Sequence, residues 1–184
     1  MLDGVLAAGV RLVQYRAKSG VERNVVRRMH ARTQAAGALL IVNDDPEAAL
    51  EADGLHAGQE DLALLDARAL RAVLGSRLLG ISCSTPEEAL SAAALGADYV
   101  GVGPFAATRT KKDAGEPIGE SGLRRVVEAS ALPVAAIGGI DLDNLAAVAR
   151  AGAAMAAVVS AIARGPDPEA NARALVARWS ALVP

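Results

Sequence analysis

The chain has 184 residues, of which 52% are apolar and 22% are charged, and this is enough to bury the core of one domain. Only 2% of the residues are aromatic, so alanine and the aliphatic residues must fill a core of the kind found in sheets that helices cover. The formal net charge of −2 gives no general attraction to nucleic acid or membranes. No apolar run reaches the roughly 18 residues of a membrane span, the N-terminus is unlike a signal peptide, and the single cysteine excludes an internal disulfide. We therefore expect a cytoplasmic protein.

Short apolar runs alternate with longer alanine-rich stretches along the whole chain. This alternation predicts successive βα units, a parallel sheet and one domain over residues 1–184. We expect strands at Val10–Gln14, Leu39–Val42, Gly54–His56, Leu79–Ser82, Tyr99–Gly103, Val134–Gly138 and Met155–Val159. We expect helices at Val21–Ala36, Ala67–Leu74, Pro86–Leu95, Ser121–Ala129, Leu142–Arg150 and Pro168–Trp179.

The number of expected strands bears on the fold class. A (β/α)8 TIM barrel has eight strands, and the sequence shows one fewer. The segment Leu2–Gly9 is typical of the end of a helix, which in a barrel follows a first strand. We therefore predict an α/β fold, a (β/α)8 TIM barrel that lacks its first β-strand, in an N-terminally truncated single domain. An open doubly wound sheet, which tolerates any number of strands, is the alternative.

In either architecture the ligand binds at the carboxyl ends of the strands. Gln14, Arg16 and Lys18 alternate at the end of the first expected strand, so their side chains point to the same side. Two cations and an amide in the mouth of a barrel indicate an anionic ligand, because unpaired charges there would be costly. The alternative is a solvated loop, where arginine and lysine are common.

Acidic residues follow the next two expected strands. Asp44 comes directly after one strand, and Asp61 follows the other and can supply a second oxygen ligand. Two carboxylates, phosphate oxygens and water are the usual surroundings of Mg²⁺, so we predict a magnesium ion held by Asp44 and Asp61. We interpret the neighbouring Asp45 as the N-cap of a helix that begins at Pro46.

Four further residues have side chains that could bind a ligand, transfer a proton or act as a nucleophile. Ser82 stands at a strand end and can hydrogen-bond a ligand. Cys83 has no histidine or basic residue near it in sequence to lower its pKa, so we do not expect it to act as a nucleophile. We interpret His56 as a packed, structural residue rather than a base, and His30 as a surface residue of a charged helix.

The long polar segment after the fifth expected strand is a candidate binding loop, because loops of this length in compact domains are usually functional. Thr108 and Thr110 offer hydroxyl groups, and Lys111 offers a point charge, all of which suit phosphate oxygens. Such a loop can also close over a site and exclude water. The alternative is a disordered surface excursion.

The last two expected strands end at Gly138-Gly139 and at Val159-Ser160. In barrels, a phosphate is commonly held here by backbone N–H groups, and glycine lets the main chain approach it closely. No Ser–His–Asp order, zinc spacing, GxGxxG motif or P-loop is present. The candidate site combines cations, hydroxyls and two carboxylates, a set suited to a departing diphosphate and to the positioning of a second substrate.

An ordered set of short motifs resembles thiamine-phosphate synthase across nearly the whole chain. The motifs are Gln14-x-Arg16-x-Lys18, Asn43-Asp44, Gly58-Gln59-Glu60-Asp61, Gly80-Ile-Ser82, Asp98-Tyr-Val-Gly-Val-Gly-Pro104, Thr108-x-Thr110-Lys111, Ile137-Gly-Gly-Ile140 and Val159-Ser160-Ala-Ile162. Each motif alone is weak, and their order is specific. The chain departs from the family at Ser84, where histidine is common, and at Ala107, where proline is common.

The resemblance implies a transferase that condenses aminomethylpyrimidine diphosphate with thiazole phosphate and releases diphosphate, with Mg²⁺ as cofactor and Asp44 and Asp61 as its ligands. In that family the pyrimidine C–O bond ionises before the thiazole nitrogen attacks, so no protein nucleophile is needed. The implied pyrimidine diphosphate site consists of Gln14, Arg16, Lys18, Asn43, Ser82 and Lys111, of which Arg16, Lys18, Ser82 and Lys111 act in catalysis. The implied thiazole phosphate site consists of Thr108, Thr110, Gly139, Val159 and Ser160.

Two other functions remain as alternatives. One is a thiazole tautomerase of the related barrel branch, which we expect to lack the complete diphosphate set. The other is a non-catalytic ligand-binding remnant, suggested by the missing strand. In each case we expect small-molecule partners and neither nucleic acid nor a membrane. A homo-oligomer is also possible, because the unpaired edge strands of an incomplete barrel favour association with other chains.

Overall fold

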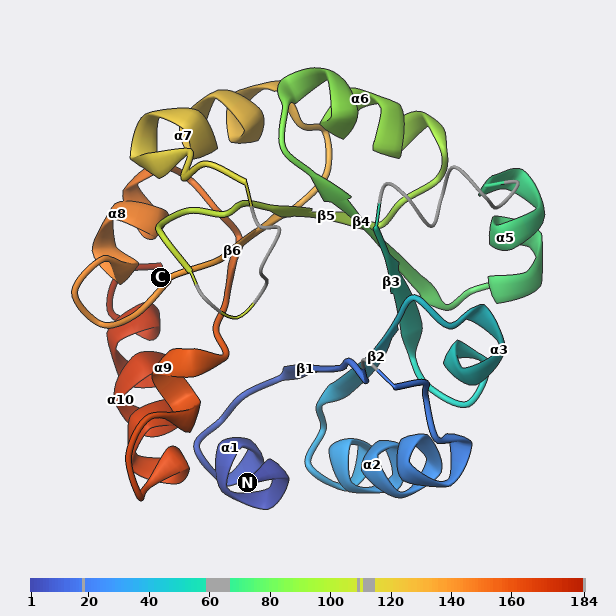
Figure 1. Cartoon of the computed structure of the whole chain (residues 1–184). Coiled ribbons are helices and arrows are strands. Elements are labelled where there is room, and N and C mark those ends of the chain that lie inside the picture. Colours follow the sequence, from blue (N-terminus) through green and yellow to red (C-terminus); the bar gives the residue numbers. More distant parts are fainter. Residues whose placement is uncertain (18, 59–66, 109, 111–114, 184) are drawn as a thin grey trace.

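The computed structural model describes residues 1–17, 19–58, 67–108, 110 and 115–183. It contains a seven-stranded sheet whose strands lie side by side in sequence order, and every pair of neighbours is parallel. The strands are β1 (Leu12–Tyr15), β2 (Leu39–Asn43), β3 (Gly54–Ala57), β4 (Leu78–Cys83), β5 (Tyr99–Val102), β6 (Val134–Ile137) and β7 (Met155–Ala157). The sheet curls around a central axis (Figure 1).

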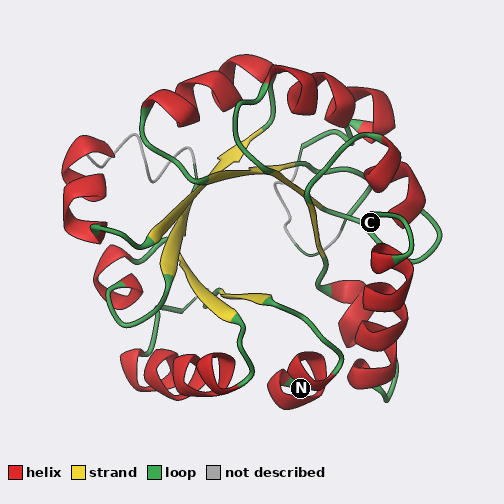
Figure 2. Cartoon of the chain, turned by 180° about the vertical axis from the view of Figure 1, so that it is seen from behind, coloured by secondary structure: helices red, strands yellow, loops and turns green. Residues whose placement is uncertain are grey.

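The helices lie on the outside of the curled sheet (Figures 1 and 2). They are α1 (Leu2–Ala7), α2 (Arg23–Ala35), α3 (Pro46–Ala49), α5 (Ala67–Leu74), α6 (Pro86–Ala94), α7 (Gly119–Ala129), α8 (Leu145–Arg150), α9 (Ser160–Ala163) and α10 (Pro168–Ser180). The predicted strands and helices are confirmed, with ends that move by a few residues. The short helix α9 was not expected. It ends the last strand early, at Ala157.

Local sequence explains where several helices begin. The side chains of Asp45, Thr85 and Asp167 accept hydrogen bonds from backbone N–H groups in the first turns of α3, α6 and α10, and a proline follows each of them. A side-chain cap satisfies an N–H that the helix cannot, and proline is pre-shaped for the first helical position. The interpretation of Asp45 as an N-cap is confirmed.

The main core lies between the sheet and the helices. The strand residues that face the helices are large and fully buried, and the helices meet them with small residues that allow close approach. This set includes Leu40, Val42, Leu55, Leu79, Ile81, Val100 and Val102 from the strands and Ala48, Ala49, Ala89 and Ala92 from the helices. Each large aliphatic side chain contributes about 1.5–3 kcal/mol by its burial, so aliphatic strands and alanine-rich helices supply most of the core, with few aromatic residues such as Phe105.

Two aspartates fasten neighbouring strands where the strands begin. Asp53 Oδ2 accepts a hydrogen bond from the backbone N–H of Leu40 at 2.8 Å, and Asp98 Oδ2 accepts one from Leu79 at 2.8 Å. Arg71 from α5 also donates to Asp98, at 3.0 Å. This repeated arrangement helps to hold β2 beside β3 and β4 beside β5, at the end of the sheet opposite to the strand carboxyl ends.

The curled sheet is open between its first and last strands. β1 and β7 are the two ends of the strand order, and within residues 1–17, 19–58, 67–108, 110 and 115–183 no strand pairs with their outer sides. The strand order runs in sequence without the reversal of a doubly wound sheet, so that alternative is wrong. The prediction of an incomplete TIM-type barrel is confirmed.

Helix α1 lies beside α10 at this opening (Figures 1 and 2). Val5 of α1, the C-cap residue Ala8 and Ala172 of α10 form a small buried cluster, against which Leu2 and Ile162 pack. The first and last helices of the chain therefore meet next to the two edge strands. Of the helices in the described ranges, none combines the length and the apolar character needed to cross a bilayer.

Candidate active site

Strand register determines which side chains face the inside of the curled sheet. Asn43 is in register with His56, His56 with Gly80, and Gly80 with Tyr99. Partners in register point to the same side of a parallel sheet, and so do alternate residues of one strand. These four positions, together with Ser82, thus share the inner face, opposite to the face that packs against the helices.

The end of β1 carries two of the predicted diphosphate ligands. Gln14 is in register with Ile41, so it lies on the inner face as well. Gln14 and Arg16 are exposed, whereas Tyr15 between them is half-buried and packs against the main core. Their opposite orientations are those expected from the alternation in sequence. The third residue of this motif, Lys18, lies outside the described residues.

Asp44, at the end of β2, has an unusual backbone conformation. Its φ is +63°, and no other non-glycine residue in the described part of the chain has a positive φ. Its N–H donates a hydrogen bond to His56 O at 2.9 Å, and the side-chain amide of the buried Asn43 donates to its Oδ2. The side chain of Asp44 is exposed at the strand end. A strained residue held by its neighbours in this way is typical of functional sites.

Three polar side chains, linked in a row by hydrogen bonds, cross the inner face of the sheet. His56 Nδ1 lies 3.0 Å from Tyr99 Oη, and His56 Nε2 lies 3.0 Å from Ser82 Oγ. His56 is 9% exposed and Tyr99 is 7% exposed. Burial lowers the pKa of His56 to about 4 and raises the pKa of the Tyr99 phenol. Both groups are therefore neutral near pH 7, and His56 is packed, as expected from the sequence.

Glycines on two strands make room for this pair of rings. A Cβ atom on Gly80 would lie 2.5 Å from His56 Nδ1, and one on Gly101 would lie 2.8 Å from His56 Cε1. His56 of β3 and Tyr99 of β5 thus meet above Gly80 of β4, which lies between them. Barrel interiors are filled in a similar way, by layers of side chains from alternate strands. Nothing in the local sequence marks Tyr99 as a site residue. The strand glycines are the one sign of a close approach.

The loop after β5 is fastened to the end of β6. Phe105 N–H donates to Ile137 O at 2.8 Å, and Ala106 N–H donates to Gly138 O at 2.9 Å. These hydrogen bonds continue the pairing of the two strands beyond their ends. They bring the loop that was predicted to bind phosphate against the glycine pair that was predicted to do the same.

Gly139 allows the closest part of this contact. Its φ is +65°, and a Cβ atom there would lie 2.6 Å from Ala107 O. Thr108 follows directly, and its Oγ1 accepts a hydrogen bond from Thr110 N–H at 3.2 Å. Gly139, Thr108 and Thr110 therefore belong to one region. Lys111 lies outside the described residues.

The remaining predicted residues lie after β7. Val159 directly precedes α9 and Ser160 is its first residue, and both are exposed. They occupy the carboxyl end of the last strand, next to the opening of the sheet. The predicted second metal ligand, Asp61, lies outside the described residues. Among the residues that the structure does describe, no three His, Cys, Asp or Glu side chains gather to hold a metal ion.

Two further expectations have different outcomes. Cys83 is buried, and burial together with Glu88 raises the pKa of its thiol to about 12, which agrees with the expectation that it does not act as a nucleophile. The placement of His30 at the surface is wrong. Its side chain is 22% exposed, and its Nε2 lies 3.2 Å from Asp53 Oδ1 without the angle of a hydrogen bond. The histidine is therefore half-buried, beside the residue that precedes β3.

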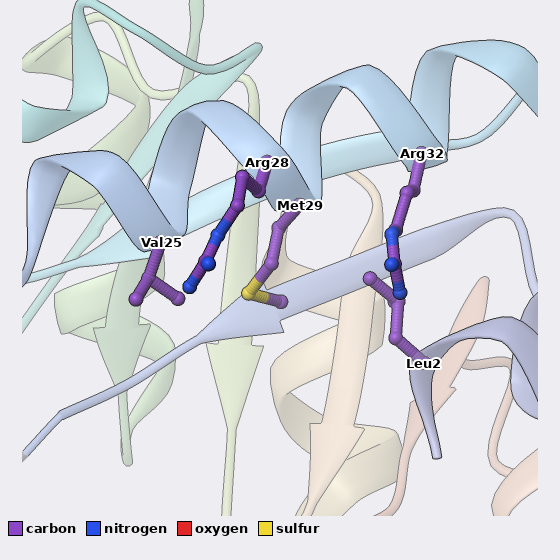
Figure 3. A pocket seen from close by; sticks show the side chains of 5 residues that line it. All are labelled: Leu2, Val25, Arg28, Met29 and Arg32. Carbon is purple, nitrogen blue, oxygen red and sulfur yellow. The ribbon is translucent and has the colours of Figure 1, made fainter.

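A cavity of about 300 Å³ lies elsewhere, between α1 and α2. Figure 3 shows Leu2 of α1 facing a stripe of α2 side chains. The stripe consists of Val25, Arg28, Met29 and Arg32. None of the predicted site residues lines this cavity, so it is separate from the strand ends.

Known proteins place this geometry in a family. The family model described as thiamine monophosphate synthase matches residues 1–162. Thiamine-phosphate synthase of Chloroflexus aurantiacus is 44% identical over 180 residues, which are 95% of this chain and 82% of that protein. The enzyme of Moorella thermoacetica is 46% identical over 181 residues, covering 95% and 85%. A bifunctional ThiM/ThiE protein of Symbiobacterium thermophilum is 45% identical over 182 residues, but the chain spans only 37% of its length.

Solved structures agree with this assignment. Thiamine phosphate pyrophosphorylase from Pyrococcus furiosus superposes with a TM-score of 0.90 at 31% identity, covering 100% of this chain and 89% of that one. A 3-hexulose-6-phosphate synthase, with a TM-score of 0.73 at 20% identity, shares the fold alone. The open sheet, the strand-end residues and these matches lead to one conclusion, that the chain belongs to the thiamine monophosphate synthase family.

Proposed function

We propose that this chain is a thiamine-phosphate synthase, a cytoplasmic transferase that joins aminomethylpyrimidine diphosphate to thiazole phosphate and releases diphosphate. The observation that carries the proposal is the connected group at the ends of β2, β3 and β4. Asp44 and Asn43 are bonded to each other, Asp44 is bonded to the backbone of His56, and His56 lies against Ser82. Two motifs that are far apart in sequence, Asn43-Asp44 and Gly80-Ile-Ser82, therefore meet through His56, within a family whose named members are thiamine-phosphate synthases.

The pyrimidine diphosphate is assigned to this connected group and to β1 beside it. Gln14, Arg16, Asn43 and Ser82 supply amide, guanidinium and hydroxyl groups, and the proposed set is completed by Lys18 and Lys111. The bond between the pyrimidine methylene carbon and the diphosphate oxygen breaks, and both electrons leave with the diphosphate. Cationic side chains around the leaving group stabilise the charge that develops on it.

A magnesium ion fits the donor chemistry at the end of β2. The Asp44 carboxylate is exposed there, and oxygen ligands of this kind are what magnesium prefers beside phosphate groups. Asp61 is the second proposed ligand. When bound, the ion adds positive charge that stabilises the diphosphate as it leaves.

The thiazole phosphate is assigned to the neighbouring region after β5, β6 and β7. Thr108, Thr110 and Ser160 offer hydroxyl groups to the phosphate, and the close-packed Gly139 and the exposed Val159 offer backbone N–H groups. The thiazole nitrogen donates its electron pair to the methylene carbon and forms the new C–N bond. No side chain needs to act as a nucleophile, which agrees with the buried and protonated thiol of Cys83.

A reaction with the purified chain tests the proposal. With both substrates and Mg²⁺, equal amounts of diphosphate and thiamine phosphate should appear, and omitting either substrate or adding EDTA should stop both. Diphosphate release without thiazole phosphate would contradict the coupled reaction. Retained binding of both substrates, measured calorimetrically, with no product would instead favour the non-catalytic remnant.

A further inference from the structure

Gly138 and Gly139 form a turn at the end of β6 in which the protein holds both carbonyl groups. The Ala106 N–H donates a hydrogen bond to Gly138 O at 2.9 Å. The side-chain amide of Asn144, which directly precedes α8, donates one to Gly139 O at 2.8 Å. The two carbonyls are thus fixed from two different places, the loop after β5 and the start of α8.

These two contacts also determine where the next two N–H groups point. A trans peptide group is planar, and its C=O and N–H bonds point in opposite directions. Because Gly138 O faces Ala106, the N–H of Gly139 points away from the loop after β5. Because Gly139 O faces Asn144, the N–H of Ile140 points away from the start of α8.

Neither of these two N–H groups donates a hydrogen bond to any group in the described part of the chain. Ile140 is only 3% exposed, and it belongs to the main core. Buried backbone N–H groups are seldom left without an acceptor, because their lost hydration is costly. Successive free N–H groups in a turn bind anions, and this turn lies at the carboxyl end of a strand, where barrels hold phosphate.

The Asn144 side chain is held at both ends of its amide. Its Oδ1 accepts a hydrogen bond from Asp141 N–H at 3.0 Å, and its Nδ2 makes the bond to Gly139 O. A backbone N–H can only donate, so the amide oxygen must face Asp141 and the amide nitrogen must face Gly139. A carboxylate in the same place could only accept, so it would keep the first bond and lose the second.

We propose that Asn144 is a positioning residue, which fixes the peptide between Gly139 and Ile140 so that the N–H groups of both residues donate to the phosphate of the thiazole substrate. The identity of this ligand rests on the proposed function, whereas the orientation of the two N–H groups does not. Asn144 acts through the peptide and does not touch the phosphate. Its effect is therefore confined to the phosphate group and does not extend to the thiazole ring or to the pyrimidine diphosphate.

Amide NMR of ¹⁵N-labelled protein with inorganic phosphate tests the positioning without turnover. An amide proton that donates to a charged oxygen shifts downfield, so the largest downfield shifts should belong to Gly139 and Ile140. Asn144→Ala should bind phosphate about tenfold more weakly, the size of a weakened hydrogen bond to a charged group. Unchanged shifts of both amides at saturating phosphate, or wild-type affinity in Asn144→Ala, would overturn the proposal. This result decides the role of Asn144 even if the proposed function fails.

Kinetics distinguish the phosphate from the rest of the reaction. Asn144→Ala should raise KM for thiazole phosphate about tenfold and leave KM for the pyrimidine diphosphate within about twofold of wild type. With the thiazole alcohol, which lacks the phosphate, kcat/KM should be the same in both proteins, because the two N–H groups have no anion to hold. An equal loss with the alcohol would mean that the substitution damages the whole site, contrary to the proposal.

A second variant keeps the test sharp if Asn144→Ala folds poorly. Asn144→Asp retains an acceptor for the Asp141 N–H and loses the donor to Gly139 O, so it should fold and still bind phosphate at least about tenfold more weakly. Wild-type phosphate affinity in this variant would contradict the proposal. Because Asn144→Ala adds no charge, agreement between the two variants assigns the loss to the missing donor.

Ser130→Ala is the matched control at the other end of β6. The Ser130 hydroxyl accepts a hydrogen bond from Leu132 N–H at 3.1 Å and donates to Leu132 O at 2.9 Å. Its removal deletes side-chain bonds to a turn, as Asn144→Ala does, and should leave phosphate affinity within about twofold of wild type. An equal loss of phosphate affinity in Ser130→Ala would mean that Asn144 has a structural role only.

Discussion

Asp44 has a φ of +63°, in the left-handed region that L-residues other than asparagine and aspartate rarely enter. Such a residue costs about 1–3 kcal/mol and persists only when its neighbours hold it. Here the hydrogen bonds with His56 O and with the Asn43 side chain do so. The conformation leaves Asp44 exposed at the end of β2, with its carboxylate hydrogen-bonded to the Asn43 amide.

Two substitutions at Asp44 separate its charge from its conformation. Asp44→Asn keeps a residue that tolerates the left-handed region, so folding should match wild type while magnesium-dependent turnover falls at least about 100-fold. Asp44→Ala should lose the same turnover and also lower the free energy of unfolding by about 1 kcal/mol. Steady-state rates over a magnesium titration and urea unfolding measure the two effects. Wild-type turnover in Asp44→Asn would contradict the metal assignment.

His56 predicts how stability depends on pH. Burial lowers its pKa from 6.5 to about 4, so between these values the unfolded chain binds a proton that the folded chain does not. The free energy of unfolding should therefore fall as the pH drops from about 6.5 towards 4, by about 3 kcal/mol in total. Urea unfolding in EDTA at several pH values measures this slope.

His56→Asn is the matched control for that slope. Arginine partners lower the pKa values of Glu51 and Glu120 below the usual 4.5, so these carboxylates affect stability only at more acidic pH. Between pH 6.5 and 4.5 the variant should show a nearly flat profile. A slope equal to that of wild type would show that another group titrates.

At the scale of the strands, the inner layer depends on glycines. Gly101→Ala would place a Cβ atom 2.8 Å from His56 Cε1, and overpacking of this kind should lower the free energy of unfolding by about 1–3 kcal/mol. In a His56→Ala background the obstructing ring is gone, so the same change should cost less than about 0.5 kcal/mol. Urea unfolding of wild type, the two single variants and the double variant gives the coupling free energy between Gly101 and His56. Equal costs in both backgrounds would mean that the strain arises elsewhere.

The sequence was sufficient for most elements because their signals are local. Apolar runs marked each strand, and Asp45 and Thr85 with their prolines marked helix starts. The final strand was predicted too long, because the apolar residues before Ser160 continue past its end at Ala157. Tyr99 was missed because its partner His56 is 43 residues away, and only the register of β3, β4 and β5 brings them together. His30 was misplaced for the same reason, since its partner Asp53 lies on a different element.

At the scale of the whole molecule, α1 and α10 connect the two ends of the open sheet. Ala172 is fully buried in their contact, whereas Ala174 on the same helix is exposed. Ala172→Glu should separate the helices and lower the free energy of unfolding by about 2–4 kcal/mol, because it buries an unpaired charge. Hydrogen exchange should then increase most in α1 and β1.

Ala174→Glu is the control for helix propensity and added charge. It should change the free energy of unfolding by no more than about 0.5 kcal/mol and leave the exchange of α1 and β1 as in wild type. If both variants behaved alike, the α1–α10 contact would not hold the edge of the sheet.

The edge position of β1 links the occupancy of the site to the survival of the protein. In the part of the chain that the structure describes, β1 has a strand neighbour on one side only, and segments of this kind open at a lower free energy than the interior of a sheet. Under the proposed function, a diphosphate bridging Gln14 and Arg16 to residues of β2 and β4 would cross-link this edge. Ligand at 100 times its Kd adds about 2.7 kcal/mol to the folded state. In a cell short of pyrimidine diphosphate, proteases would then degrade this protein sooner. The supply of the substrate would thus determine the lifetime of the protein that uses it.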